Sequence, residues 1–153
     1  MIERLRKSSD KLLEGMDHLS ESEETVGKIQ TELKGLEGKE VDSLRKLTTV
    51  MQDSIKAIRE SINGKTTDRQ GLSRPAQITI MNKIGDAQTY IMSKSVAPGA
   101  QEEQLVKNAE VAINDAVKRI NNFYASKWMD YRRFVESTRV PLFKDYSPIA
   151  IGE

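Results

Sequence analysis

Residues 39–62, KEVDSLRKLTTVMQDSIKAIRESI, decide the fold class of this chain. Asn63 and Gly64 follow directly, and this pair is typical of the C-terminus of a helix. The stretch therefore predicts an amphipathic helix that buries one face against other helices. The residues of that face recur at intervals of three or four, as a helix requires, and are Val41, Leu44, Leu47, Met51, Ile55, Ile58 and Ile62.

The residues before this stretch predict another helix that packs against it. Residues 2–35 carry apolar side chains mostly at intervals of three, four or seven residues, which draws one apolar stripe on a helix. Gly35 and Gly38 bracket a short turn, as a helix C-cap and a chain reversal would. Because the turn is short, we expect these two helices to be antiparallel neighbours.

The residues after residue 62 predict two more helices. Pro75 suits the first turn of a helix, so a third helix is expected over residues 76–94. A Pro-Gly turn follows, and a long fourth helix is expected over residues 101–138. Pro141 forbids any continuation of that helix, because proline lacks the backbone N–H and clashes with the preceding turn.

These stretches together predict that residues 1–153 form one all-α domain, an up-and-down antiparallel four-helix bundle. The first and fourth helices are the longer two, and a capping loop and an irregular C-terminal tail complete the domain. We expect residues 2–11 and residues 121–138 to overhang the shorter helices at one end. The loop 63–75 would cap that end. The apolar surface at that end of the bundle would be covered by Leu72, Leu142, Phe143 and Tyr146.

The charge and the cysteine content exclude several classes of protein. The chain has 24 Lys and Arg residues against 23 Asp and Glu residues, a net charge of +1, so no affinity for nucleic acid is expected. It has no cysteine, which excludes disulfides, thiolate metal ligands and cysteine nucleophiles. No apolar run approaches the roughly 20 residues that a membrane helix needs, so no insertion into a membrane is expected.

His18 is the only histidine, and it limits the catalytic and metal-binding options. It lies off the apolar stripe beside Asp17, and a transition-metal site would otherwise need carboxylates alone. A di-iron bundle needs two Glu-x-x-His pairs, which one histidine cannot supply. No phosphate-binding loop and no nucleophile motif is present in the sequence. We therefore expect no enzyme activity, no metal and no cofactor.

The fourth predicted helix carries one candidate binding region. Trp128, Tyr131 and Arg132 combine aromatic and cationic side chains at helical spacing. They are either core aromatics with a solvated arginine, or a platform on which nucleic-acid bases would stack. The nearly neutral net charge favours the first interpretation.

The longest connection, TTDRQGLSRP at residues 66–75, is the other candidate binding region. As a structural cap, it would use Leu72 to cover apolar surface, while its arginines satisfy helix ends or pair with acids of the first helix. As a binding loop, it would present Arg69, Leu72 and Arg74 to a partner, because long structured loops often carry function.

A series of motifs between residues 60 and 150 resembles one known family. The family is that of large exported bacterial proteins with sortilin-like or BNR-repeat β-propellers, often labelled glycosyl-hydrolase-like, and the resemblance is to their C-terminal helical region. The motifs that carry it are, in order, Gly64, Asp68-Arg69-Gln70-Gly71, Pro75, Ala87, Tyr90-Ile91, Asn122-Phe123, Trp128, Tyr131-Arg132, Val135-Glu136, and the closing Pro141-Leu142-Phe143 and Tyr146-Ser147-Pro148-Ile149.

The resemblance implies that this chain is a non-catalytic accessory module. Any hydrolase activity of such a protein would belong to the propeller, which this chain lacks, and no catalytic residue carries over. The resemblance also implies that Met1 is not the native start and that the parent protein is periplasmic or bound to the cell envelope. The partner would then be the rest of the parent chain, with Arg69 and Arg74 at the contact.

A second interpretation stays open. If the chain is complete, we expect a free-standing cytoplasmic helical adaptor or oligomerisation protein that binds a partner through its aromatic end. Long amphipathic helices often self-associate, so the partner could also be a second copy in a homodimer. In either case the expected interface residues are Arg69, Leu72, Arg74, Trp128, Tyr131 and Arg132.

Overall fold

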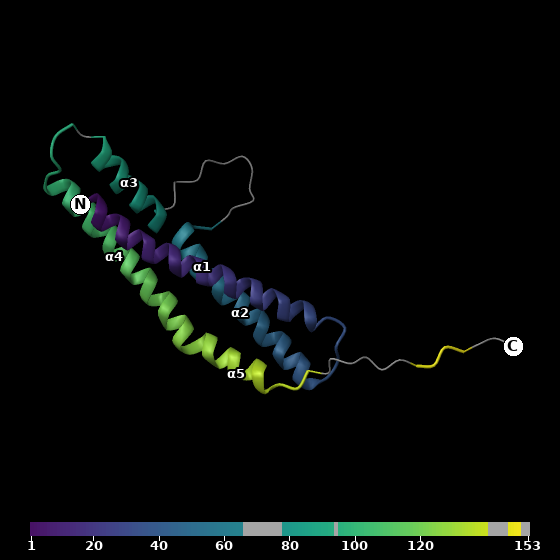
Figure 1. The fold of residues 1–153 in the computed structure, drawn as a ribbon. Coiled ribbons are helices and arrows are strands. Elements are labelled where there is room, and N and C mark those ends of the chain that lie inside the picture. Colours follow the sequence, from purple (N-terminus) through teal and green to yellow (C-terminus); the bar gives the residue numbers. More distant parts are fainter. Residues whose placement is uncertain (66–77, 94, 141–146, 151–153) are drawn as a thin grey trace.

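The computed structural model describes residues 1–65, 78–93, 95–140 and 147–150. Within these ranges the chain contains helices and no strand, so the predicted all-α four-helix bundle is confirmed (Figure 1). The first and last helices are the longest, as predicted. The helices are α1 (Ile2–Glu32), α2 (Lys39–Asn63), α3 (Ile80–Met92) and a long helix made of α4 (Ala100–Phe123), η1 (Tyr124–Trp128) and α5 (Met129–Ser137).

A glycine turn joins α1 to α2, as the sequence predicts. Gly35 and Gly38 have φ angles of 77° and 135°, which residues with a side chain rarely adopt. Arg45 of α2 secures the turn, because its Nη2 donates hydrogen bonds of 2.8 Å to the carbonyl oxygens of both Leu33 and Leu36. These carbonyls follow the last turn of α1 and have no helical partner of their own.

α2 packs antiparallel against the C-terminal part of α1. Arg59, near the end of α2, forms an ion pair with Glu23. Gln52, two turns earlier in α2, donates a hydrogen bond of 2.7 Å to Gln30. Rising residue numbers on α1 therefore meet falling numbers on α2, and the predicted antiparallel pairing of these helices is confirmed.

α1 and the long fourth helix, in contrast, run in the same direction. Near the start of α1, Arg4 forms ion pairs with Glu103 at 2.8 Å and with Glu110 at 2.7 Å. Further along α1, the Ser22 hydroxyl lies 2.6 Å from that of Tyr124. Residue numbers therefore rise together on the two helices, which start at the same end of the bundle.

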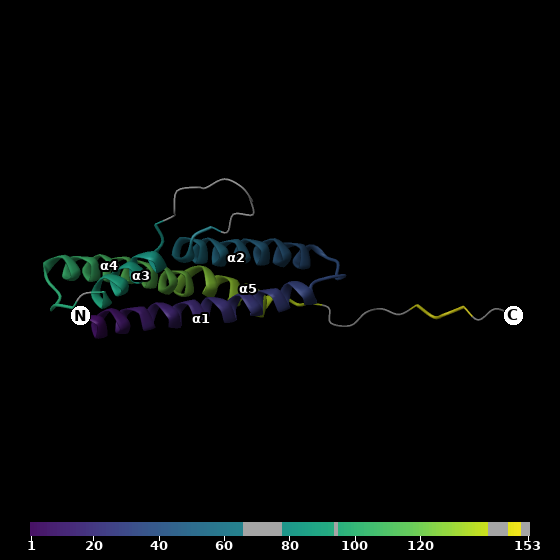
Figure 2. The same cartoon turned by 90° about the horizontal axis from the view of Figure 1, so that it is seen from above.

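α1 and the long helix run in the same direction because α2 and α3 follow each other along the bundle. In Figures 1 and 2, α2 lies beside the C-terminal part of α1 and α3 lies beside its N-terminal part. The expected overhang of residues 2–11 at the aromatic end is therefore wrong, because these residues lie beside the start of α4. Residues 121–138 lie at the opposite end, where Tyr131 contacts Thr48 of α2.

Two predicted helix ends also differ from the structure. α1 ends at Glu32 instead of residue 35, because the chain leaves the helix to reach the glycine turn. α3 begins at Ile80 instead of residue 76, because the hydroxyl of Thr79 accepts a hydrogen bond of 3.1 Å from the backbone N–H of Asn82 and caps the helix there.

Three further expectations concern residues outside the described ranges. They are the role of Pro75, the cap formed by the loop 63–75 beyond residue 65, and the apolar cover formed by the tail. Of the tail beyond residue 140, the structure describes residues 147–150, which are all exposed. Ile149, for example, is 90% exposed, so these four residues do not cover the bundle.

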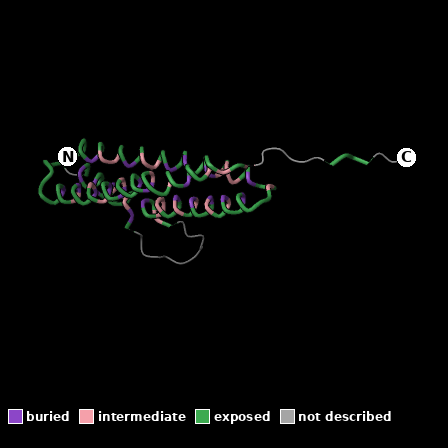
Figure 3. Tube along the Cα trace, turned by 90° about the horizontal axis from the view of Figure 1, so that it is seen from below, coloured by how far each residue is buried: buried purple, intermediate pink, exposed green. Residues whose placement is uncertain are grey.

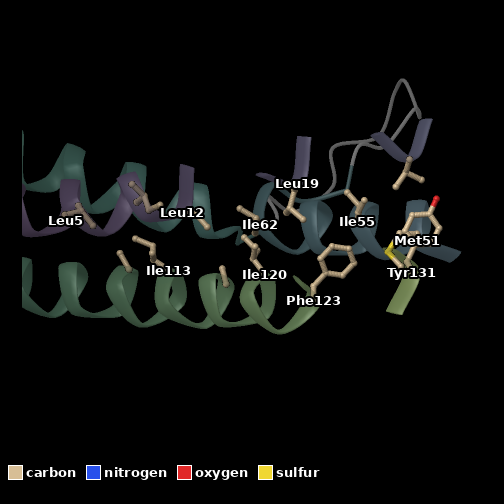
Figure 4. Packing of buried hydrophobic residues seen from close by; sticks show 14 of the residues in the cluster. Leu5, Leu12, Leu19, Met51, Ile55, Ile62, Ile113, Ile120, Phe123 and Tyr131 are labelled. Atoms are coloured by element: carbon tan, nitrogen blue, oxygen red, sulfur yellow. The ribbon is translucent and has the colours of Figure 1, made fainter. Parts of the chain in front are cut away.

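The buried core runs along the whole bundle, on the inward faces of the helices (Figure 3). Figure 4 shows the buried leucines of α1 on one side of the interior, facing Ile113 and Ile120 of α4. The spacing of these leucines is that of a coiled-coil seam. α1 contributes a fully buried apolar residue at every seventh position, namely Leu5, Leu12, Leu19 and Val26, and Leu33 continues the series just after the helix ends.

Candidate functional site

A π-helical segment, η1, interrupts the long helix where its aromatic residues begin. Phe123 precedes this segment and Tyr131 follows it, and both side chains are buried, at 5% and 2% exposure. A π turn contains about one residue more than an α turn. In an uninterrupted α-helix, the step from Phe123 to Tyr131 would overshoot two turns by about 80°. The π segment absorbs the extra residue, so both rings point into the core.

Four aromatic side chains form a contiguous cluster around η1, which we call the aromatic cluster. Its members are Phe123, Tyr124, Trp128 and Tyr131. The centroid of the Trp128 ring lies 6.1 Å from that of Phe123, 5.8 Å from that of Tyr124 and 5.9 Å from that of Tyr131. These separations are typical of favourable tilted and edge-to-face pairs, so Trp128 is fixed by three ring contacts at once.

The hydroxyls of the two cluster tyrosines are held by other helices. The hydroxyl of Tyr124 lies 2.6 Å from that of Ser22 in α1, and the hydroxyl of Tyr131 lies 3.1 Å from that of Thr48 in α2. Burial raises the pKa of Tyr124 and of Tyr131 above the ordinary tyrosine value, although both hydrogen bonds act in the opposite direction. Both phenols therefore stay protonated at neutral pH and join α1 and α2 to the long helix.

A cavity of about 320 Å³ lies beside the aromatic cluster, between α1 and the η1–α5 segment, and we call it the aromatic cavity. Trp128 and Val135 supply apolar surface on the long helix, and Ile29 supplies it on α1. At the rim, Arg132 donates a hydrogen bond of 2.8 Å to Glu136, which raises the pKa of the guanidinium. The cavity thus combines apolar walls with a paired charge at its rim.

The structure brings three of the six predicted interface residues together at this cavity. Trp128, Tyr131 and Arg132 all line it. Trp128 is half-buried and Arg132 is exposed, whereas Tyr131 is buried and supports the wall from behind. The other three lie outside the described residues, and they are Arg69, Leu72 and Arg74.

Sequence reasoning did not identify the wall that α1 contributes. Thr25 and Ile29 line the aromatic cavity opposite α5. Periodicity shows which residues of a helix share a face, but it does not show which neighbouring helix that face meets. The aromatic end was expected beside residues 2–11, whereas it lies beside Thr25 and Ile29 in the C-terminal half of α1.

His18, which lies off the apolar stripe of the first helix, is exposed in the structure. Its ring makes an edge contact with Tyr124, with centroids 6.3 Å apart. Over the described ranges, no group of three or more His, Cys, Asp or Glu side chains is placed to hold a metal ion. In the same part of the chain, no helix combines the length and the apolar character needed to cross a membrane.

Comparisons with models of protein families, with curated proteins and with solved structures found no match to this chain. Function is therefore inferred from the residues and geometry of the chain.

Proposed function

We propose that this chain is a non-catalytic helical interaction module that binds a partner protein at the aromatic cavity. The observation that carries the proposal is the position of Trp128, half-buried on the cavity wall and held by three other rings. Trp, Tyr and Arg dominate the binding energy of protein interfaces, and rigid anchors lose little conformational entropy on binding. Trp128 and Arg132 supply this kind of surface.

The polar groups of the cavity suit recognition better than proton transfer. Arg132 is paired with Glu136, and the Tyr131 hydroxyl is engaged by Thr48. A general acid or base needs a pKa near the working pH, whereas the contact with Glu136 keeps Arg132 charged and burial keeps the Tyr131 phenol neutral. This arrangement is consistent with the proposed binding function.

The resemblance described above supports one kind of partner. We infer that the chain is the accessory module of a larger exported β-propeller protein, in the periplasm or cell envelope, and that it contacts the rest of that protein. In this proposal Arg69, Leu72 and Arg74 add to the same contact. Any hydrolase activity would reside in the propeller.

A free-standing adaptor or oligomerisation protein, acting in the cytoplasm, is the second candidate. The observation that favours it is that α1, η1 and α5 together line the aromatic cavity, so all of its lining residues belong to this chain. Here the partner is a separate protein or a second copy in a homodimer.

Site-specific photocrosslinking in the source cells tests the proposal. Photoreactive benzoylphenylalanine would replace Glu136, which lines the cavity and is 60% exposed, or Arg133, which is 74% exposed but does not line it. We expect one defined crosslinked product from position 136, none from position 133, and loss of the product when Trp128→Ala is added. Equal products from both positions, or none from position 136, would overturn the proposal.

The identity of the crosslinked peptide then separates the two kinds of partner. A peptide from a propeller in the same polypeptide supports the accessory module of an exported protein. A peptide from a separate protein, or from a second copy of this chain, supports the adaptor or oligomerisation protein. Mass spectrometry of the product band reads out each case directly.

A further inference from the structure

A second hollow of about 570 Å³ lies on another face of the bundle, between α2 and the junction of α4 with η1. We call it the α2–α4 groove. It shares no lining residue with the aromatic cavity, so it is a separate surface. Its residues recur at intervals of three or four on both helices, which means that each helix presents a continuous ridge along the groove.

The floor of the groove is apolar. Phe123 of α4 extends toward α2 (Figure 4), and Ala57 and Ile58 of α2 line the groove beside it. Val50 lies at one end of the groove and is 54% exposed, so this large apolar side chain faces solvent. Two parallel ridges with apolar residues between them form the kind of groove into which an amphipathic helix packs.

The two walls of the groove differ in charge. On the α4–η1 wall stand two cations, Arg119 and Lys127, and on the α2 wall stands one anion, Asp53. The ion pairs formed among the described residues involve none of these three side chains. Arg119 and Lys127 therefore form no ion pair within the described bundle, and they complement an acidic edge on an incoming helix.

We propose that the α2–α4 groove binds an amphipathic helix of another polypeptide, with its apolar stripe on Val50, Ala57 and Ile58 and an acidic edge along Arg119 and Lys127. Among the described helices of this chain, each one already buries its apolar stripe in its own core. None of the described helices of a second copy is therefore free to fill the groove, and we assign the occupant to a different polypeptide. The bound helix would add a further helix to the bundle beside α2 and α4.

A designed helical peptide is the probe for this proposal. Its leucines recur at i, i+3, i+4 and i+7, and glutamates follow one flank of that stripe. A matched peptide carries lysine in place of each glutamate. Fluorescence anisotropy of each labelled peptide, titrated with the full chain, gives the two affinities. We expect the acidic peptide to bind about tenfold or more tightly than the basic one.

Charge reversal on the protein provides the decisive comparison. Arg119→Glu combined with Lys127→Glu should invert the preference, so that the basic peptide binds more tightly than the acidic one. Lys118→Glu is the matched control, because Lys118 is exposed on the same helix but does not line the groove. All three residues are exposed, so circular dichroism should show an unchanged fold.

Three results would overturn the proposal. The first is the absence of binding by the acidic peptide. The second is a change in peptide preference that is as large in Lys118→Glu as in the double variant, because this would indicate diffuse attraction by the whole surface. The third is an unchanged affinity of Val50→Asp for the acidic peptide, since a charge at this apolar end of the groove should weaken the binding of that peptide about tenfold or more.

Discussion

Thr48 determines the direction of the buried hydrogen bond that joins α2 to α5. Its hydroxyl donates to the carbonyl oxygen of Leu44 at 2.7 Å, and a hydroxyl has only one hydrogen to donate. In the contact of 3.1 Å with Tyr131, Thr48 must therefore accept and Tyr131 must donate. The two residues are 0% and 2% exposed, so water cannot replace either partner.

Because Tyr131 donates and Thr48 accepts, we expect the two residues to differ in how much stability is lost when each is replaced. Tyr131→Phe removes a donor but leaves the Thr48 hydroxyl bonded to Leu44, so we expect a loss of about 1 kcal/mol in the free energy of unfolding. Thr48→Val leaves the Tyr131 hydroxyl buried without an acceptor, and we expect a larger loss of about 1–3 kcal/mol. Urea unfolding of both variants measures the difference.

The double variant is the control for this prediction. Thr48→Val with Tyr131→Phe removes both partners, so it should be more stable than Thr48→Val alone. A double variant as unstable as the sum of the two single changes would mean that the hydroxyl of Tyr131 gains nothing from Thr48.

Two glycines of α1 differ in what surrounds them, although both lie inside the helix. A Cβ at Gly27 would meet no atom within 4 Å, whereas a Cβ at Gly15 would lie 2.9 Å from Cδ1 of Ile120. Gly27→Ala should therefore raise the free energy of unfolding by about 0.5–1 kcal/mol through helix propensity. Gly15→Ala should raise it less or lower it, because Ile120 has to move. Equal gains from both changes, in thermal unfolding, would show that α1 and α4 are not closely packed at Gly15.

At the scale of the helices, the apolar periodicity correctly predicted which stretches of the chain are helical. The predicted bounds 39–62 and 101–138 differ by at most one residue at each end from α2 and from the long helix as a whole. Apolar stripes this long fix a helix, because each one must be buried over its whole length. The stripe of α1 likewise predicted its start, although not its last turn.

Two features of the helices were not predictable from periodicity. Both Pro75 and Thr79 are residue types that can begin a helix. In the structure the hydroxyl of Thr79 caps the N-terminus of α3. The π segment depends on a conflict between two stripes, one ending at Phe123 and the next including Tyr131. Only the packed bundle shows that Phe123 and Tyr131 are both buried. Because both are buried, the helix between them must accommodate one extra residue, and the π segment does so.

Removal of one residue from η1 should therefore be tolerated. Deletion of Ala125, which is exposed, turns the step from Phe123 to Tyr131 into seven residues, which two α turns accommodate. We expect the variant to fold, with the Tyr131–Thr48 contact retained and a small change in melting temperature. Deletion of the exposed Asn114 in the regular part of α4 is the matched control.

The control deletion should be far more damaging, because it rotates every later residue of α4 by about 100° and moves Ile120 and Phe123 out of the core. Circular dichroism and thermal melts compare the two variants. If deletion of Ala125 unfolds the protein as completely as deletion of Asn114, then η1 is not an insertion that the helix can lose.

For the molecule as a whole, connection length explains what the sequence could and could not predict. The short turn around Gly35 forces α1 and α2 to be antiparallel, and that prediction is confirmed. The connection from α2 to α3 is long enough either to reverse direction or to continue, and no pattern in the helices chooses between these paths. The direction of the fourth helix relative to α1 follows from that choice.

The candidate site was predictable to the same extent. Trp128 and Arg132 stood out by residue type, because aromatic and arginine side chains at helical spacing suit an interface. Ile29 did not stand out, because its role depends on α1 and the long helix running in the same direction. The sequence of one helix shows only the residues that this helix contributes to a site between two helices, and not those of the facing helix.

The whole bundle should unfold as one cooperative unit, because α1 and the long helix run through both halves. Leu5 lies near one end, and Trp128, the single tryptophan, lies in the other half. Leu5→Ala should lower the free energy of unfolding by about 2–5 kcal/mol. The fluorescence of Trp128 and the helical circular dichroism should report the same lowered midpoint.

Urea unfolding followed by both probes checks this prediction, with Leu13→Ala as the matched control, because Leu13 is 51% exposed and should cost little. A Trp128 transition that Leu5→Ala leaves in place, together with a biphasic circular dichroism curve, would mean that the two halves unfold separately.

The shared direction of α1 and the long helix also has a mechanical consequence. The chain enters the bundle at one end and leaves it at the other (Figures 1 and 2). A pulling force between Ile2 and Ser137 is therefore directed along the helix axes, and it loads the α1–α4 contacts in shear, all at once, instead of peeling them apart one by one. With a long helix of about 57 Å at 1.5 Å per residue, the bundle is a stiff strut between its two ends.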